Sequence, residues 1–277
     1  MYLGVFADEI APEFGEQVTH CLAEDVKNIE LRSVDGVNVL DLDADACVAT
    51  KKKARAAGIV INCIGSPIGK VKIDEPFEPH FERFKLAVER AKFFDAGMVR
   101  IFSFYPAEGE TKADLIANYR GEVLRRLEAM TEYVANSDLV LVHENEGRIY
   151  GEMAAQCLDI HTAIDSPNLR AVFDPGNYIV AGQDTLEAWQ MLKPYVVHFH
   201  IKDATTAPRR IVPAGEGDGH IPEILADAHA GGIDCALSLE PHLRPEGPYE
   251  GMNGAQRFKL AADALKQVCA RASIPLT

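Results

Sequence analysis

The sequence lacks several features that would place it in other classes of protein. None of its six cysteines forms a C-x-x-C pair, and they lie scattered along apolar segments, as buried thiols in a reducing compartment do. No apolar run approaches the ~18 residues of a membrane span. The stretch MYLGVFADEI has no basic region followed by an apolar one. We therefore expect no signal peptide and no membrane partner, and we predict a cytoplasmic protein.

Positive charge is also scarce. The 277 residues include 42 Asp and Glu against 28 Lys and Arg, which gives a formal net charge of −14. Proteins that bind nucleic acids need a basic surface to neutralise phosphates. The acidic balance therefore disfavours a nucleic-acid partner. A homo-oligomer remains compatible with the sequence.

The sequence does contain a regular alternation of short β-rich runs and longer helical patterns. Its length is close to the roughly 250 residues of one (β/α)8 barrel, and 47% hydrophobic with 25% charged residues is an ordinary globular composition. In segment 80–97, Phe81, Phe84, Val88 and Ala91 recur at helical spacing. The predicted strands are Tyr2–Ala7, Asn28–Arg32, Val60–Ile64, Met98–Phe102, Leu139–Glu144, Ala171–Asp174, Val196–Ile201 and Ala236–Glu240.

This alternation implies parallel strands joined by right-handed crossovers. A doubly wound open sheet is the alternative fold, but it usually carries G-x-G-x-x-G after its first strand, where this sequence reads ADEIAPEFGEQ. Eight units close more naturally into a barrel, and no linker or low-complexity segment interrupts them. We predict one α/β domain over residues 1–277, a single (β/α)8 TIM barrel.

The last four predicted strands each end in a residue that can bind a metal. They read LVLVHENE, AVFDPGN, VVHFHIKD and ALSLEPHL, and strand alternation directs Glu144, Asp174, His200 and Glu240 toward the barrel axis. Singly, a strand-end glutamate is more often a helix cap or an ion-pair partner, and a lone histidine is more often a core residue. Four on consecutive strands, at the barrel end where active sites form, predict one shared site.

Three carboxylates and one imidazole meeting at a point are costly to bury without a cation. We therefore predict one divalent metal ion held by Glu144, Asp174, His200 and Glu240. The oxygen-rich donor set favours Mn²⁺, Mg²⁺ or Co²⁺. An open site of histidine and carboxylates also suits Zn²⁺.

The motifs ADEI, IELRSVDGVNVLDL, HENE, FDPGN, HIKDA, VPAGEGDG and LSLEPHL together resemble the xylose isomerase-like barrel superfamily. The resemblance covers nearly the whole chain and lies in the sugar phosphate isomerase/epimerase branch, with inosose isomerase and the ketose 3-epimerases as relatives. It implies the same four metal ligands. It further implies that Glu144 and Glu240 move protons on a bound ketose and that Lys202 touches a substrate oxygen. Asn177 stands where ketose 3-epimerases carry a substrate-binding histidine, which leaves the substrate open.

The resemblance implies a metal-dependent isomerase or epimerase that acts on a keto sugar, a sugar phosphate or an inosose through an enediolate. A metal-dependent dehydratase of a keto-cyclitol or oxidised sugar is the alternative, since it would begin with the same proton abstraction. An endonuclease of the abasic-site type is more remote, because the loops after the second and third strands lack the histidines that its extra zinc ions need. A non-catalytic sugar-binding barrel is a further alternative.

Two further residues of the predicted barrel interior are candidates for substrate binding. Glu30 shares a strand face with Arg32, and Arg100 interrupts the apolar run MVRIF, so both could line the mouth. An interior ion pair between Glu30 and Arg100 is an equally good interpretation. His198 lies one layer deeper than the predicted ligand on its strand and is expected in the core, and no role is assigned to His242 beyond the last strand.

Overall fold

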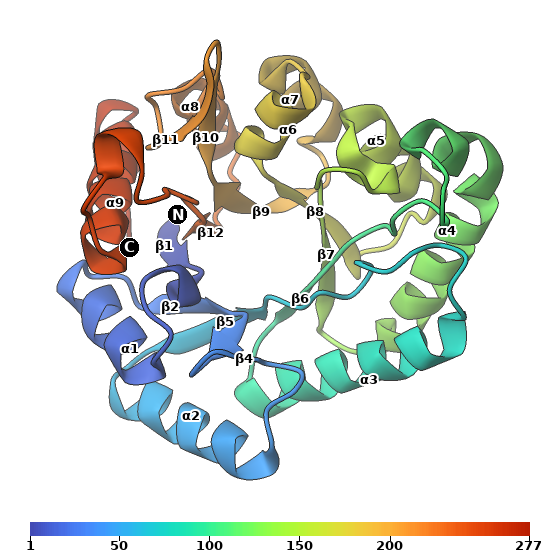
Figure 1. The fold of residues 1–277 in the computed structure, drawn as a ribbon, viewed down its shortest axis with the longest axis horizontal. Coiled ribbons are helices and arrows are strands. Elements are labelled where there is room, and N and C mark those ends of the chain that lie inside the picture. Colours follow the sequence, from blue (N-terminus) through green and yellow to red (C-terminus); the bar gives the residue numbers. More distant parts are fainter.

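The computed structural model describes residues 1–277 and confirms the predicted (β/α)8 barrel (Figure 1). Eight parallel strands close in the order β1-β12-β9-β8-β7-β6-β5-β2, and β1 pairs with β12 to complete the ring. Each predicted strand is present, with ends that differ by two residues at most. The barrel strands are β1 Tyr2–Val5, β2 Asn28–Leu31, β5 Val60–Ile64, β6 Met98–Ile101, β7 Val140–Glu144, β8 Leu169–Phe173, β9 Val196–Ile201 and β12 Ala236–Leu239.

Helices surround the strands and bury their apolar faces against them (Figure 1). Their starts follow from capping residues: Thr111 and Asp114 form a capping box before α4, and Asn253 and Gln256 form another before α9. None of the helices combines the length and apolar character that a membrane crossing needs. The helices are α1 Phe14–Ala23, α2 Ala44–Ala56, α3 Phe77–Phe94, α4 Lys112–Val134, α5 Ala154–Ala163, α6 Pro175–Ala181, α7 Thr185–Leu192, α8 Ile221–Ala230 and α9 Gly254–Arg271, with short 3-10 turns η1 Ala7–Glu9, η2 Tyr150–Glu152 and η3 Gly247–Tyr249.

The barrel interior changes from apolar to polar along the strands. Cys63, Val142 and Val172 form a small apolar cluster inside it. Glu144 follows Val142 by two residues on β7, and Asp174 follows Val172 by two residues. Both therefore lie on the same face as these valines. All six cysteines are free and buried, as predicted. Because the polar layer occupies only the C-terminal end of the strands, the lower interior can remain a packed core.

Two β-hairpins lie at the C-terminal end of the barrel, and the sequence analysis did not predict them. One joins β3 Ser33–Val34 to β4 Val37–Asn38, and the other joins β10 Asp203–Thr206 to β11 Arg209–Val212. The glycine-rich turn after β11 wraps around the Asp203 carboxylate, which accepts hydrogen bonds of 2.8, 3.1 and 3.0 Å from the backbone N–H groups of Gly215, Gly217 and Gly219. This carboxylate fixes the β10–β11 hairpin beside the mouth.

The loop after β5 depends on one glycine. Gly69 has φ of +91°, and its N–H donates a 2.9 Å hydrogen bond to Nε2 of buried His80. A Cβ atom at this position would collide with the backbone carbonyl of Phe102. The loop therefore lies directly on the chain beyond β6.

We expect Gly69→Ala to lower the free energy of unfolding by about 2–4 kcal/mol, because it adds a steric clash to an unfavourable positive φ. Gly58→Ala is the matched control, since Gly58 also has a positive φ but has open space around its Cβ position. It should cost only about 1–2 kcal/mol. Urea unfolding of both variants measures the difference, and equal losses would contradict the tight packing of this loop.

Candidate metal centre

Four strands bring their terminal side chains to one buried point. Glu144 ends β7, Asp174 follows β8, His200 lies near the end of β9 and Glu240 follows β12. One ligand atom from each lies within 4.8 Å of the others, and each residue is at most 3% exposed. Asp174 is also the N-cap of α6, where its Oδ1 accepts a 2.9 Å hydrogen bond from the N–H of Asn177. The structure therefore brings together the four residues that the sequence singled out.

The donor atoms of this cluster fit a divalent cation. The Nδ1 atom of His200 lies 3.1 Å from Oε1 of Glu144 and 3.7 Å from Oε2 of Glu240. Both Nδ1 and the Oδ2 atom of Asp174 are buried without a directed hydrogen bond. The Lys202 ammonium, 2.8 Å away, compensates Oδ2, whereas Nδ1 faces carboxylate oxygens and is costly to bury unless a proton or a metal ion occupies its lone pair. Carboxylate oxygens and an imidazole nitrogen are suitable ligands for Mg²⁺, Mn²⁺ or Zn²⁺, so the cluster could hold a metal.

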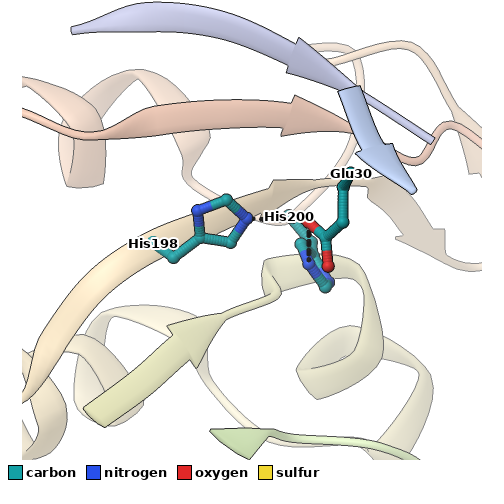
Figure 2. A group of neighbouring side chains, drawn as sticks. All are labelled: Glu30, His198 and His200. Atoms are coloured by element: carbon teal, nitrogen blue, oxygen red, sulfur yellow. Dashed lines mark hydrogen bonds and ion pairs between the residues drawn. The ribbon is translucent and has the colours of Figure 1, made fainter. Parts of the chain in front are cut away.

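A carboxylate behind the cluster orients His200 (Figure 2). Glu30 on β2 contacts Nε2 of His198 at 2.9 Å and Nε2 of His200 at 3.2 Å through the same oxygen, and all three side chains are fully buried. If both Nε2 atoms carry hydrogens that point at Glu30, Nδ1 of His200 faces the cluster. Burial lowers the pKa of His200, but Glu144 and Glu30 outweigh it and raise this pKa to about 10, so Nδ1 carries a proton that a metal ion would displace. The ion pair between Glu30 and Arg100 that the sequence allowed is not formed, because the two histidines engage Glu30.

Two arginines neutralise the glutamates. Nη1 of Arg100 lies 3.1 Å from Oε2 of Glu144 and 3.9 Å from Oε1 of Glu240. Nη1 of Arg32 donates a 2.9 Å hydrogen bond to Oε1 of Glu240. Burial alone would raise the pKa of Glu144, but His200 and Arg100 outweigh it and hold the pKa at about 2. Glu144 is therefore ionised at neutral pH.

Lys202 is the third cation of the site. Its Nζ lies 2.8 Å from Oδ2 of Asp174 and 3.4 Å from Oε2 of Glu240, and the residue is only 5% exposed. Burial would raise the pKa of Glu240, but Lys202 is the largest of the influences that lower it. Burial dominates at Asp174 and raises its pKa to about 6, even with Lys202 beside it. The three carboxylates are therefore unequal, and Asp174 is the least readily ionised.

Two asparagines hold the loops that carry the carboxylates. The side chain of Asn145 donates to the carbonyl of Asp174 and accepts from its N–H, both at 3.0 Å. The amide of Asn177 donates to the carbonyl of Asn145 at 2.8 Å and lies 3.4 Å from Oε1 of Glu144. Sequence analysis missed Asn145, although its place beside Glu144 in HENE is a usable signal.

His242 also reaches the site, although the sequence analysis assigned it no role. Its Nε2 lies 3.4 Å from Oε1 of Glu240, and its Nδ1 lies 3.2 Å from Oε1 of Glu9 on η1. The positive φ of His242, +47°, turns the chain back after the last strand. Because its side chain is 45% exposed, His242 connects the buried cluster with the outer surface.

The chain resembles proteins of known fold, and some of them have an assigned activity. A family model described as xylose isomerase-like TIM barrel matches residues 23–268. A 3-dehydroshikimate dehydratase of Bacillus anthracis is 23% identical over 137 residues, which are 50% of this chain and 48% of that relative. The match thus spans about half the length of the curated relative.

Three solved structures share the fold over nearly their full length. The probable 3-DHS dehydratase of petrobactin synthesis from Bacillus anthracis has a TM-score of 0.76 at 19% identity, covering 96% of this chain and 99% of its own. A xylose isomerase-like TIM barrel protein from Mycobacterium smegmatis in complex with magnesium gives 0.74 at 13%, covering 99% and 97%. A D-psicose 3-epimerase in the presence of D-fructose gives 0.73 at 15%, covering 98% and 99%.

Identities this low establish a common fold and leave the activity open. The family model, however, extends over most of the chain and includes all four strand ends of the cluster. This protein belongs to the xylose isomerase-like TIM barrel family.

Proposed function

We propose that this protein is a metal-dependent isomerase or epimerase that acts on a keto sugar, a sugar phosphate or an inosose, with the ion held by Glu144, Asp174, His200 and Glu240. One observation carries the proposal: two glutamates from non-adjacent strands converge on one buried cluster, and each of them forms an ion pair with an arginine. A bound divalent cation would supply electrophilic stabilisation of the oxygen that becomes negative when the neighbouring C–H bond breaks.

The two glutamates are suited to move a proton. One carboxylate, Glu144 or Glu240, accepts the proton from the carbon next to the carbonyl, and the electron pair of that C–H bond moves toward the carbonyl oxygen to give an enediolate. Return of a proton from the carboxylic acid to the former carbonyl carbon, with transfer of the hydroxyl proton from the neighbouring oxygen to the former carbonyl oxygen, gives isomerisation. Return of a proton to the other face of the original carbon gives epimerisation. Arg100 lies within 3.9 Å of both carboxylates and favours the ionised form, which is the form that can accept a proton.

The remaining polar residues position the substrate or the ligands. Lys202, Arg100 and Asn177 lie beside the cluster and can each offer an N–H donor to a substrate oxygen. Glu30 was a candidate for the same role, but its engagement by His198 and His200 supports a positioning role behind the cluster. In this arrangement Glu30 fixes the ring of His200 and does not meet the substrate.

A dehydratase of a keto compound is the second candidate function. It is favoured by the likeness to the Bacillus anthracis dehydratase in both sequence and structure. The first step is the same in both candidates, and they separate afterwards: an isomerase returns the proton, whereas a dehydratase expels a hydroxide with a proton donor at the leaving oxygen. Loss of water from the product mass and a rise in enone absorbance would identify the dehydratase.

We expect Glu240→Gln to reduce solvent-proton exchange by about 10²- to 10⁴-fold, since the amide cannot accept the proton. The measurement is deuterium incorporation from D₂O into a panel of D-fructose, D-tagatose and 2-keto-myo-inositol, with the metal content of each sample determined in parallel. Glu146→Gln is the control, because Glu146 lies just beyond Glu144 but pairs with Lys70 outside the cluster. Undiminished exchange by a metal-loaded Glu240→Gln protein would remove Glu240 from proton transfer.

Metal uptake tests the ligand set without any substrate. We expect one Mn²⁺ per chain by calorimetry, and a loss of affinity of more than about 100-fold in Asp174→Asn, beyond the range typical of residues behind a ligand. Glu146→Gln should bind as the unaltered protein does. If Asp174→Asn bound Mn²⁺ as tightly as the control, the ion would lie elsewhere.

The role of Glu30 gives a graded prediction. Glu30→Gln should weaken Mn²⁺ binding by about 10- to 100-fold, because the amide orients His200 less well and does not raise its basicity. This loss is smaller than that of Asp174→Asn in the same titration. An affinity equal to that of the unaltered protein would show that the hydrogen bonds from His198 and His200 do not support the centre.

A further inference from the structure

A second feature of the barrel mouth lies next to Glu240. A cavity of about 580 Å³ opens between α6, the β10–β11 hairpin and the loop after β12. Its volume is in the range of sites for small organic molecules. Figure 1 shows the hairpin standing over the same sector of the barrel as α6 and β9. The walls are formed by Val180, Arg209, Arg210, Ile211, His242, Arg244, Glu246, Gly247, Pro248 and Tyr249.

The cavity is lined by the segments that follow β8, β9 and β12, the strands that position Asp174, His200 and Glu240. Val180 lies in α6 after Asp174, the hairpin follows the strand of His200, and Arg244 follows Glu240 by four residues. His242 belongs to both places, because it lines the cavity and lies 3.4 Å from Oε1 of Glu240. A molecule in the cavity would therefore lie one side chain away from the metal centre.

Three arginines give this cavity a positive wall in an otherwise acidic protein. The guanidinium groups of Arg209, Arg210 and Arg244 are exposed, and none of them forms an ion pair or a side-chain hydrogen bond. The net charge of the chain is −14, so unpaired arginines gathered in one cavity are unexpected. Glu246 is the single acidic residue of the wall. The remaining charge is positive and available to a ligand.

Guanidinium groups recognise oxyanions with paired N–H donors, and they do so for phosphate and for carboxylate. The strands β9 and β12 are the seventh and eighth of the barrel, and the loops after these two strands frequently form anion sites in (β/α)8 enzymes. Val180, Ile211 and the buried Tyr249 add an apolar surface for a carbon skeleton. The positive charge, the position after the seventh and eighth strands and the apolar surface together indicate a small organic oxyanion as the ligand.

We propose that this arginine cavity, defined by Arg209, Arg210 and Arg244, binds the oxyanion group of the substrate, so that the substrate is a phosphorylated or carboxylated keto compound and not a neutral sugar. This inference rests on the proposed function, because it takes the reacting carbon to lie at the metal centre. The oxyanion supplies binding energy away from the reacting carbon and orients the carbonyl toward Glu144 and Glu240.

The test compares a triple variant with a charge-matched control. Arg209→Gln, Arg210→Gln and Arg244→Gln are combined in one protein, and Lys52→Gln, Lys53→Gln and Arg148→Gln in another, since these last three side chains are exposed, form no ion pair and do not line the cavity. Binding of inorganic phosphate and of acetate to each metal-loaded protein is measured by calorimetry and NMR titration. Anion bound at the metal itself contributes equally to all proteins.

We expect the unaltered protein and the charge-matched control to bind one of the two anions, and the arginine variant to lose at least about 10-fold of that affinity. A preference for phosphate identifies a phosphorylated substrate, and a preference for acetate a carboxylated one. Equal affinities in the two triple variants, or no binding of either anion to the unaltered protein, would overturn the proposal. The single variant Arg244→Gln repeats the comparison if the triple variant unfolds.

Failure of this inference can be told apart from failure of the proposed function. The same preparations are assayed for Mn²⁺ content and for deuterium exchange into the neutral keto compounds and into D-fructose 6-phosphate. If the unaltered protein binds metal and exchanges deuterium, but the arginine changes leave the anion affinity unaltered, only the anion site is refuted. Absence of both metal and exchange in the unaltered protein refutes the proposed function itself, whatever the anion titration shows.

Discussion

The structure depends on one electrostatic constraint, the burial of three carboxylates within a few ångströms of one another. Such a cluster is strongly unfavourable unless cations or hydrogen bonds compensate it. Arg32 and Arg100 supply positive charge at the two glutamates, and Lys202 supplies it at Asp174. The barrel makes this possible, because four separate strands deliver the carboxylates and the imidazole while the surrounding helices keep water away from the lower interior.

The ion pair between Lys202 and Asp174 affects how the site can bind ligands. Nζ of Lys202 lies 2.8 Å from Oδ2, the oxygen of Asp174 that has no directed hydrogen bond. A metal ion bound to that oxygen and the lysine ammonium would repel each other. Under the proposed function, a metal ion there would weaken the pairing of Lys202 with Asp174, and a substrate oxygen beside the cluster would be a suitable partner for the ammonium group. In that proposal, Lys202 stabilises the metal-free site and contacts the substrate in the metal-loaded one.

The sequence was sufficient for the barrel and for the convergence of the four residues, because both follow from strand alternation. It could not give the pairing of charges. Arg32 and Glu240 are 208 residues apart, and whether Arg100 meets Glu30 or Glu144 depends on the stagger of strands around the ring. The β10–β11 hairpin and His242 were missed for a different reason. They lie beyond strand ends, where tight turns and positive φ angles direct the side chains and periodicity gives no information.

The choice between proton return and loss of water depends on which acid stands near the departing oxygen. His200 and Arg100 lower the pKa of Glu144, and Lys202 and His242 lower that of Glu240, so before the reaction both glutamates are bases and not acids. A glutamate becomes an acid only after it has taken a proton from the substrate. Isomerisation and epimerisation use that proton directly, whereas expulsion of hydroxide needs it to reach a different atom. A cluster with two ionised carboxylates and a shared arginine is therefore better matched to returning the proton to carbon, which favours an isomerase or epimerase over a dehydratase despite the likeness to dehydratases.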